Sequence, residues 1–344
     1  MHSKRKNSIG TFAAAITLLW GSLAMPTAHA TTTLVFNSYL PPRDPFTTQI
    51  IQPWAEAVGR VTDGRVKVVI PPATVTPPEQ LWSAVTGGIV DGAYFFNGFF
   101  QAQLPVEQIP EIPFTSGNAE STSIAFWKTY QKYFAKTGDY RQVKLLALFT
   151  VPAGEIFSMK SPIVTPSDFK GRRLWVLPGV PQRILQHSGA GLVSNAAFNL
   201  SELVAGGTVD GIVGVGSYTL GSFKVLPYMK SETRVQGGLS AAGFSLVINR
   251  ARWDSISPAD RKAIERISGV AFARRLGVLD KVGRHARGQA MQHGMKLLKA
   301  SPSLEAALHR WAAPLRAAWL AAAKREGVNG PAALQYFEAQ ARAD

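Results

Sequence analysis

Short apolar runs alternate with amphipathic segments along the first 250 residues of the chain. The runs with the length and composition of β-strands lie at residues 32–37, 66–70, 93–96, 144–151, 156–160, 173–177 and 212–215. Segments between them, such as 50–58, carry apolar residues at helical spacing. Because short strands alternate with helices, the pattern predicts an α/β fold whose parallel-rich sheets are covered on both faces.

One connection occurs twice. Gly-Gly-x-Val-Asp-Gly stands at residues 87–92 and again at 206–211, each time after a helical segment and before an apolar run. The paired glycines suit a helix end, because glycine enters the left-handed conformation without a Cβ clash. The repetition predicts two α/β lobes built on one plan. The alternative is that a common helix-to-strand connection arose twice.

The length of 344 residues also indicates two domains. Pro152 and Gly154 interrupt an extended stretch, which predicts the first crossing between lobes, and residues 238–249 read as a strand returning to the first lobe. Beyond residue 250 the pattern is helical, with Ser257-Pro258 as a helix start. The predicted organisation is a targeting segment at 1–30, lobe one at 31–152, lobe two at 153–237, a return segment at 238–275 and C-terminal helices at 276–344.

The first thirty residues have the layout of a secretory signal peptide. A basic start at residues 4–6 precedes an apolar run at 11–25 and the sequence Ala28-His29-Ala30. The apolar run is shorter than the roughly 20 residues that a membrane-spanning helix needs, which argues against a retained anchor. The sequence therefore predicts cleavage after Ala30 and a periplasmic location.

Composition and motifs exclude several kinds of chemistry. The chain has no cysteine and a formal net charge of +15, and its basic residues are scattered. This distribution indicates a solvated basic surface, and no nucleic-acid motif is present. The histidines lack metal-ligand spacing, and no phosphate-binding loop or nucleophile elbow occurs. We therefore expect no metal, no cofactor, no nucleic-acid partner and no enzymatic activity.

Several motifs occur together in a recognisable order. They are Gln-Pro-Trp-Ala-Glu at 52–56, Thr-Asp-Gly-Arg-Val at 62–66, the two Val-Asp-Gly triplets, Lys-Ser-Pro-Ile at 160–163, Asp-Phe-Lys-Gly at 168–171, and Val-Ile-Asn at 247–249 before Trp-Asp-Ser-Ile-Ser-Pro-Ala-Asp-Arg at 253–261. Together they resemble the substrate-binding proteins of tripartite ATP-independent periplasmic (TRAP) transporters of the DctP type.

This resemblance, which covers nearly the whole chain after residue 30, implies a two-lobed periplasmic binding protein, similar to type II. Its cleft lies between the lobes, and C-terminal helices brace both. The family traps a small molecule, most often an organic acid, and hands it to small and large membrane permease subunits. We expect a monomer.

The sequence departs from the family pattern at the expected ligand site. Members usually read Lys-Gly-Leu-Lys-Ile-Arg-Val, and that Arg grips the ligand carboxylate. Residues 170–176 read Lys-Gly-Arg-Arg-Leu-Trp-Val, so Trp175 stands in place of the Arg. The polar Gln-Glu-Asn-Pro that often follows the second Val-Asp-Gly is replaced by apolar residues at 212–215. Two polar anchors of the family site are therefore missing.

Other residues can take their place. Trp175 offers an apolar face, an N–H donor and a surface attractive to cations. Glu155 can pair with an amine, whereas Arg43 or Arg183 can hold a carboxylate. The candidate ligand-binding residues are Trp175, Asn97, Tyr218, Phe96, Tyr39, Arg43, Glu155, Phe149, Gly214 and Arg183. For each aromatic residue the alternative is ordinary core packing.

Two hypotheses for the ligand stay open. One is an organic acid held by a relocated cation or by backbone N–H groups. The other is a neutral, aromatic or cationic small molecule packed on Trp175. Two alternative functions also remain, a ligand-presenting accessory protein for a sensor kinase and a periplasmic enzyme on the same scaffold.

Overall fold

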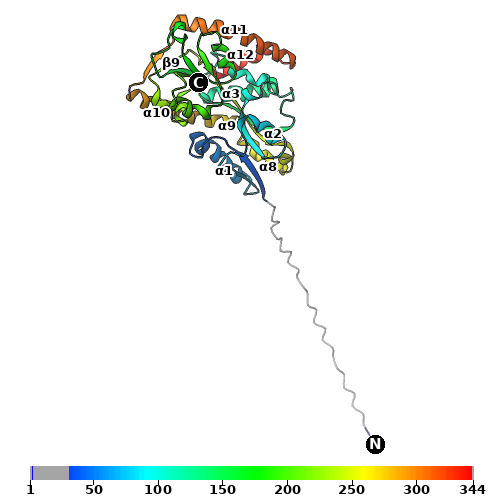
Figure 1. Ribbon diagram of the computed structural model, residues 1–344. Helices are drawn as coiled ribbons and strands as arrows, with labels where there is room; N and C mark the ends of the chain where they lie inside the picture. Colours follow the sequence, from blue (N-terminus) through cyan, green and yellow to red (C-terminus); the bar gives the residue numbers. More distant parts are fainter. Residues whose placement is uncertain (1, 3–30, 343–344) are drawn as a thin grey trace. The chain divides into compact units, whose positions relative to one another are not determined.

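A computed structural model describes residue 2 and residues 31–342 of the protein, so the predicted signal peptide and its cleavage site lie outside the described residues. Residues 31–342 form one compact unit that contains two mixed β-sheets and their covering helices (Figure 1). The two-lobe α/β fold predicted from the sequence is therefore confirmed.

The first sheet has five strands. In sheet order they are β2 (Val66–Val69), β1 (Thr32–Asn37), β3 (Gly92–Phe96), β10 (Gly243–Asn249) and β4 (Val143–Thr150). β1 pairs in parallel with β2 and β3, whereas β10 runs antiparallel to β3 and β4. The antiparallel strand is the one that returns from the second sheet, and it lies between two strands that precede the crossing.

The second sheet has six strands. In sheet order they are β11 (Lys296–Lys299), β9 (Ser231–Arg234), β5 (Glu155–Ser158), β8 (Gly211–Val215), β6 (Arg173–Val176) and β7 (Gly191–Val193). β5, which arrives from the first sheet, runs antiparallel to β8 and β9, and the other pairings are parallel. Each sheet therefore has one strand of opposite direction next to the crossing between the sheets.

Helices cover both sheets. The α-helices of the described chain are α1 (Gln52–Val61), α2 (Leu81–Thr86), α3 (Ala119–Thr129), α4 (Val180–Leu185), α5 (Leu200–Ala205), α6 (Ser217–Ser222), α7 (Arg250–Asp254), α8 (Pro258–Arg266), α9 (Val270–Ala273), α10 (Gly277–Gln292), α11 (Pro302–Arg325) and α12 (Gly330–Ala341). α3 and α12 pack against each other beside β4. Short turns of 3-10 or π-helix join several of these elements.

Alternation along the strands divides the core into four apolar clusters. Tyr94 belongs to the cluster that contains α1, and its neighbour Phe95 belongs to the cluster on the other face of the same sheet. In the second sheet, Ile212 and Val213 likewise enter opposite clusters. Because successive strand side chains point to opposite faces, apolar runs at both positions require cover on both sides.

Two chain segments cross side by side between the sheets. Residues 151–154 follow β4, and residues 239–242 precede β10. The N–H of Gly154 donates to the carbonyl of Ser240 at 2.8 Å, and the N–H of Leu239 donates to the carbonyl of Gly154 at 2.9 Å. A Cβ on Gly154 would lie 2.3 Å from the carbonyl carbon of Gly214, so only glycine allows this close approach.

Two long helices brace both sheets. Leu279 near the start of α10 packs in the cluster of α1, whereas Ala286 and Ala290 further along pack against the second sheet. α11 does the same in reverse: Leu304 enters the core of the second sheet, and the Trp319 indole donates to the Val106 carbonyl beside the first. These helices brace both lobes, as the resemblance to the family implied.

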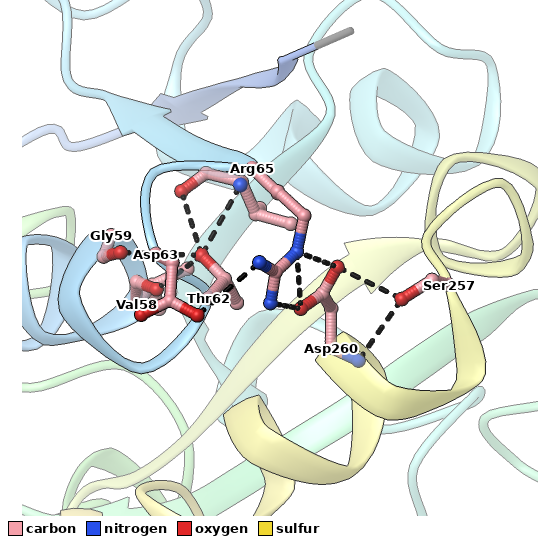
Figure 2. Close-up of polar contacts among 8 residues, drawn as sticks. Val58, Gly59, Thr62, Asp63, Arg65, Ser257 and Asp260 are labelled. Atoms are coloured by element: carbon pink, nitrogen blue, oxygen red, sulfur yellow. Dashed lines mark hydrogen bonds and ion pairs between the residues drawn. The ribbon is translucent and has the colours of Figure 1, made fainter. Parts of the chain in front are cut away.

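Two of the motifs that carried the resemblance meet in space. Figure 2 shows the guanidinium of Arg65, just before β2, against the carboxylate of Asp260 in the first turn of α8, with an Nη2–Oδ1 distance of 2.8 Å. Ser257 caps the helix: its hydroxyl accepts from the N–H of Asp260 and donates to the Asp260 carboxylate. The predicted helix start at Ser257 is thus confirmed, and the ion pair fastens α8 to the turn after α1.

One element was not expected. The C-terminal part was predicted to be helical, but β11 forms a parallel pair with β9 at an edge of the second sheet. Its four residues, Lys-Leu-Leu-Lys, lack the β-branched side chains that usually mark a strand. Pairing with the exposed edge of β9 therefore decides the conformation, and local propensity does not.

Candidate functional site

An aromatic cleft lies where the two sheets meet. Two adjoining cavities, of about 100 Å³ and about 80 Å³, share Tyr39, Leu177, Ala197, Phe223, Ala242 and Phe244 in their walls. These volumes are of the order of the ~150 Å³ apolar cavity that accommodates benzene in another protein. Their lining comes from β3, β4, β10 and the loop after β1 on one side, and from β8, α6 and the residues just after β6 on the other. We refer to the two cavities together as the aromatic cleft.

The wall from the first sheet is built of stacked rings. The rings of Phe149 and Phe244, from neighbouring strands, lie 5.3 Å apart with an interplanar angle of 13°. Phe46 also stacks on Phe149 at 5.3 Å, and it meets Tyr94 in an edge-to-face arrangement at 4.8 Å. Offset and edge-to-face ring pairs are the arrangements that aromatic side chains prefer, so this wall is suited to receive another ring.

Polar groups in the aromatic cleft are hydroxyls. None of the described residues that line it is Asp, Glu, Lys or Arg. The hydroxyl of Tyr39 has no hydrogen-bond partner among residues 31–342, whereas that of Tyr94 bonds to the Ser38 hydroxyl at 3.1 Å. Burial raises the pKa of Tyr39 well above its usual value, so this side chain stays a neutral donor.

Tyr218 joins the two lobes across the cleft. It lies on α6, and its hydroxyl donates to Oδ1 of Asp44, in the loop after β1, at 2.8 Å. The same oxygen accepts from the N–H of Phe46, and both Asp44 and Tyr218 are 4% exposed. Burial raises the pKa of Tyr218 well above the ordinary tyrosine value. The bond therefore links a neutral phenol to a buried carboxylate.

Trp175 lies beneath the cleft surface. Its side chain is 0% exposed, is absent from the lining of the cavities, and packs in one cluster with Phe96 and Leu177, which do line them. The indole N–H donates to Oδ1 of Asn195 at 2.8 Å. Trp175 thus occupies the interior with its own polar atom satisfied, and it supports the side chains that form the cleft floor.

The remaining uncharged candidates either line the aromatic cleft or lie next to it. Tyr39, Phe149, Tyr218 and Gly214 line the larger cavity, and Tyr39 and Phe96 line the smaller one. Asn97 lies just behind, fully buried, with its Oδ1 accepting from the Ser245 hydroxyl at 2.7 Å. Five of the candidate residues named from the sequence therefore line the aromatic cleft.

The three charged candidates lie outside the lining of the aromatic cleft. Arg43 is exposed, and Arg183 lies beside the buried Glu111. Glu155 accepts from the N–H of Val235 at 2.9 Å and from Nε of Arg234 at 3.2 Å. Burial raises the pKa of Glu155 to about 7, against the opposing effect of these two donors.

Several residues that line the aromatic cleft were not predicted from the sequence. Phe244 and Ala242 come from the return segment, which the pattern identified only as a strand, and Tyr94 comes from a run whose two faces could not be told apart. Leu177 and Phe223 carry no chemical signal of their own.

Among the described residues, no group of three or more His, Cys, Asp and Glu side chains is placed to hold a metal ion.

These features define a class of protein. Two α/β lobes, joined by crossing segments and braced by long helices, enclose a small-molecule cleft at the ends of their strands, as binding proteins of this architecture do.

Comparison with known proteins identifies the family. Residues 36–322 match the family DctP, described as "Bacterial extracellular solute-binding protein, family 7", and the chain belongs to this family. It is 39% identical, over 95% of its length and 96% of the relative's, to "Outer membrane transporter protein TsaT" of Comamonas testosteroni.

Solved structures agree with this assignment. A TRAP periplasmic solute-binding protein from Bordetella bronchiseptica with bound (R)- and (S)-mandelate is 30% identical, with a TM-score of 0.85, and the match covers 90% of this chain and 98% of that one. A marine metagenome TRAP protein specific for aromatic acids, in complex with 3-hydroxybenzoate, is 26% identical with a TM-score of 0.81, covering 91% and 98%. A Rhodoferax ferrireducens TRAP protein with copurified benzoate is 25% identical with a TM-score of 0.80, covering 90% and 98%.

The function predicted from the sequence is therefore confirmed at the level of the family: the chain is the substrate-binding component of a TRAP transporter. The family and the compared structures are solute-binding proteins rather than enzymes. Within residues 31–342 and residue 2, no helix is both long enough and apolar enough to cross a membrane.

Proposed function

We propose that this protein captures a small aromatic compound bearing an acidic or hydroxyl group. The observation that carries the proposal is the aromatic cleft, whose walls are rings and whose polar groups are hydroxyls. Aromatic acids are the ligands named for three of the structurally similar proteins. A ring inserted beside Phe149 and Phe244 gains both buried apolar area and favourable ring geometry.

The proposal combines the two hypotheses for the ligand. Trp175 stands in place of the family's usual Arg, so no Arg at this position faces the aromatic cleft. We therefore expect an aromatic ligand instead of the usual aliphatic acid. The Tyr39 hydroxyl, which has no partner in the described chain, offers one hydrogen bond to an acceptor on the ring. The comparisons favour this transport role over presentation to a sensor kinase.

Delivery and location complete the proposal. The mature protein, cleaved after Ala30, works in the periplasm and hands its ligand to the small and large membrane subunits of a TRAP permease. The membership of an extracellular solute-binding family and the signal-peptide pattern at residues 1–30 support this arrangement.

Calorimetric titration tests the ligand class. The panel pairs benzoate, 3-hydroxybenzoate and mandelate with the neutral benzyl alcohol and the aliphatic diacid succinate. We expect saturable binding of aromatic members and none of succinate. Binding of succinate with no binding of any aromatic member would overturn the proposal.

A variant locates the binding. Ala197 lies in the wall of both cavities, so Ala197→Phe fills the aromatic cleft without removing core atoms, and we expect it to abolish aromatic binding. Ala318→Phe, on the exposed side of α11, adds the same side chain away from the cleft and serves as the matched control.

A further inference from the structure

A second cavity with different chemistry adjoins the aromatic cleft. It encloses about 350 Å³ between α10, the crossing segments and the loop before α3. Tyr218 and Pro152 line both this cavity and the aromatic cleft, so they form the partition between the two. The charged side chains in its wall are Arg234, Arg284, Arg287, Glu155 and Asp280. We call it the arginine cavity.

The carboxylates at the arginine cavity are already satisfied by the protein. Both oxygens of Glu155 accept hydrogen bonds, one from the N–H of Val235 and one from Arg234. Both oxygens of Asp280 lie 3.0 Å from the N–H of Ala119, at the start of α3. These acceptors therefore do not draw on the remaining donors of the cavity.

The arginines, in contrast, retain unused donors. Arg234 uses only its Nε, toward Glu155, and Arg287 uses only its Nε, 2.9 Å from each carboxylate oxygen of the buried Glu232. The terminal amino groups of both, and the whole guanidinium of Arg284, make no hydrogen bond within residues 31–342. The arginine cavity thus has a surplus of charged donors over acceptors.

A buried hydroxyl adds to this surplus. Ser116, in the loop before α3, is 9% exposed, lines the arginine cavity, and its Oγ has no hydrogen-bond partner. Buried polar atoms in folded proteins are normally paired, so an unpaired one at a cavity wall indicates a missing partner. Ser116 and the three arginines line the same cavity, so the wall offers several donors and one buried hydroxyl to an acceptor-rich group.

We propose that the arginine cavity binds a small oxyanion, of the carboxylate or phosphate class. Guanidinium groups recognise such anions through paired, charge-assisted hydrogen bonds, and an anion has the acceptor oxygens that this cavity lacks. The oxyanion has two possible sources, a free anion or the acidic group of the transported ligand reaching past Tyr218. The second source rests on the proposed function, and the first does not.

The position of the cavity gives the anion a mechanical effect. Its wall includes residues of both crossing segments, such as Ala153 and Gly238, together with α10, which contacts both lobes. An anion held there ties the loop before α3, next to the first sheet, to the end of β9 in the second. Occupancy therefore favours the arrangement of lobes that encloses the aromatic cleft.

Titration with inorganic phosphate at constant ionic strength tests the site directly. We expect saturable binding to the wild-type protein and at least tenfold weaker binding to Arg284→Ala, which removes a guanidinium while the neighbouring Asp280 carboxylate keeps its bond from the N–H of Ala119. Arg60→Ala, on the exposed face of α1, removes the same charge far from the cavity and is the control. Ser116→Ala is the second variant, and we expect a smaller loss.

Benzoate and benzyl alcohol distinguish the two sources. If phosphate competes with benzoate, and Arg284→Ala weakens benzoate but not benzyl alcohol, the oxyanion is the acidic group of the ligand. If phosphate and benzoate bind together, and only phosphate binding responds to Arg284→Ala, the oxyanion is a separate effector. The inference is overturned if Arg284→Ala changes neither phosphate nor benzoate binding more than Arg60→Ala does. A protein that binds phosphate but no aromatic compound would instead contradict the proposed function alone.

Discussion

Replacing Tyr218 by Phe removes one hydroxyl and keeps the ring that separates the aromatic cleft from the arginine cavity. The lost bond is the 2.8 Å contact to Asp44, which joins α6 in the second lobe to the loop after β1 in the first. Both partners are almost completely buried. The variant therefore isolates one polar contact between the lobes.

The magnitude follows from the surroundings of Asp44. A hydrogen bond to a charged group contributes about 1.5–3 kcal/mol of stabilising free energy. When its removal leaves a buried acceptor unpaired, the cost lies in the upper part of this range. Asp44 keeps the N–H of Phe46 on Oδ1, whereas its Oδ2 has no partner. We therefore expect Tyr218→Phe to remove about 2–3 kcal/mol of stabilising free energy. If the bond forms only when the lobes enclose a ligand, affinity falls roughly 30- to 150-fold.

Calorimetric titration with the strongest ligand of the panel measures this loss. Tyr228→Phe, at an exposed position, removes a hydroxyl without a partner in the lobe contact and is expected to bind as the wild type does. A double-mutant cycle with Asp44→Asn assigns the effect to the pair, and we expect a coupling of at least 1 kcal/mol. Additive effects of the two changes, or an unchanged dissociation constant in Tyr218→Phe, would refute the reasoning.

Three further changes test other parts of the structure. Trp175→Ala empties the interior below the cleft floor and should lower the free energy of unfolding by about 3–5 kcal/mol in urea titrations. Ser257→Ala removes the cap of α8 and should cost about 1 kcal/mol, or a fall of about 2–4 °C in Tm by calorimetry. Burial raises the pKa of Glu111 from 4.5 to about 8. The unfolded chain therefore releases this proton first, and stability falls as pH rises from 4.5 to 8. Glu111→Gln should remove about 5 kcal/mol of that fall, measured by urea titration at each pH.

Each of these three has a result that contradicts it. An unfolding free energy of Trp175→Ala within 1 kcal/mol of wild type would mean that the indole does not support the floor. An unchanged Tm in Ser257→Ala would show that Arg65 alone secures the start of α8. Parallel stability–pH profiles for wild type and Glu111→Gln would show that Glu111 titrates normally in the folded protein.

Much of the fold could be predicted because its signals are local. Apolar runs located β1, β3 and β4 to within a residue or so, and Ser257-Pro258 located the start of α8. Such features depend on backbone conformation and on burial of both sheet faces, which the sequence states directly. β11 escaped because its conformation is set by pairing with β9, an interaction between distant segments.

The site was harder to predict for the same reason. Tyr39 and Phe149 were among the candidate ligand-binding residues, but periodicity could not show that Phe46, Phe149 and Phe244 stack as one wall. The exchange of Arg for Trp175 was visible in the sequence, whereas its burial against Asn195 was not.

The arginine cavity was invisible at the sequence level. Its walls come from five separate segments, around residues 117, 154, 217, 236 and 284, and nothing in their spacing indicates that they meet. Sequence motifs report neighbours along the chain, whereas a cavity between lobes depends on how the crossing segments place two sheets.

A crystal structure of the protein with benzoate tests the central claim most directly. The account predicts the ring in van der Waals contact with Phe149 and Phe244 inside the aromatic cleft, with the Tyr39 hydroxyl or the arginine cavity facing the carboxylate. A ring bound elsewhere on the protein, with the aromatic cleft empty, would contradict it.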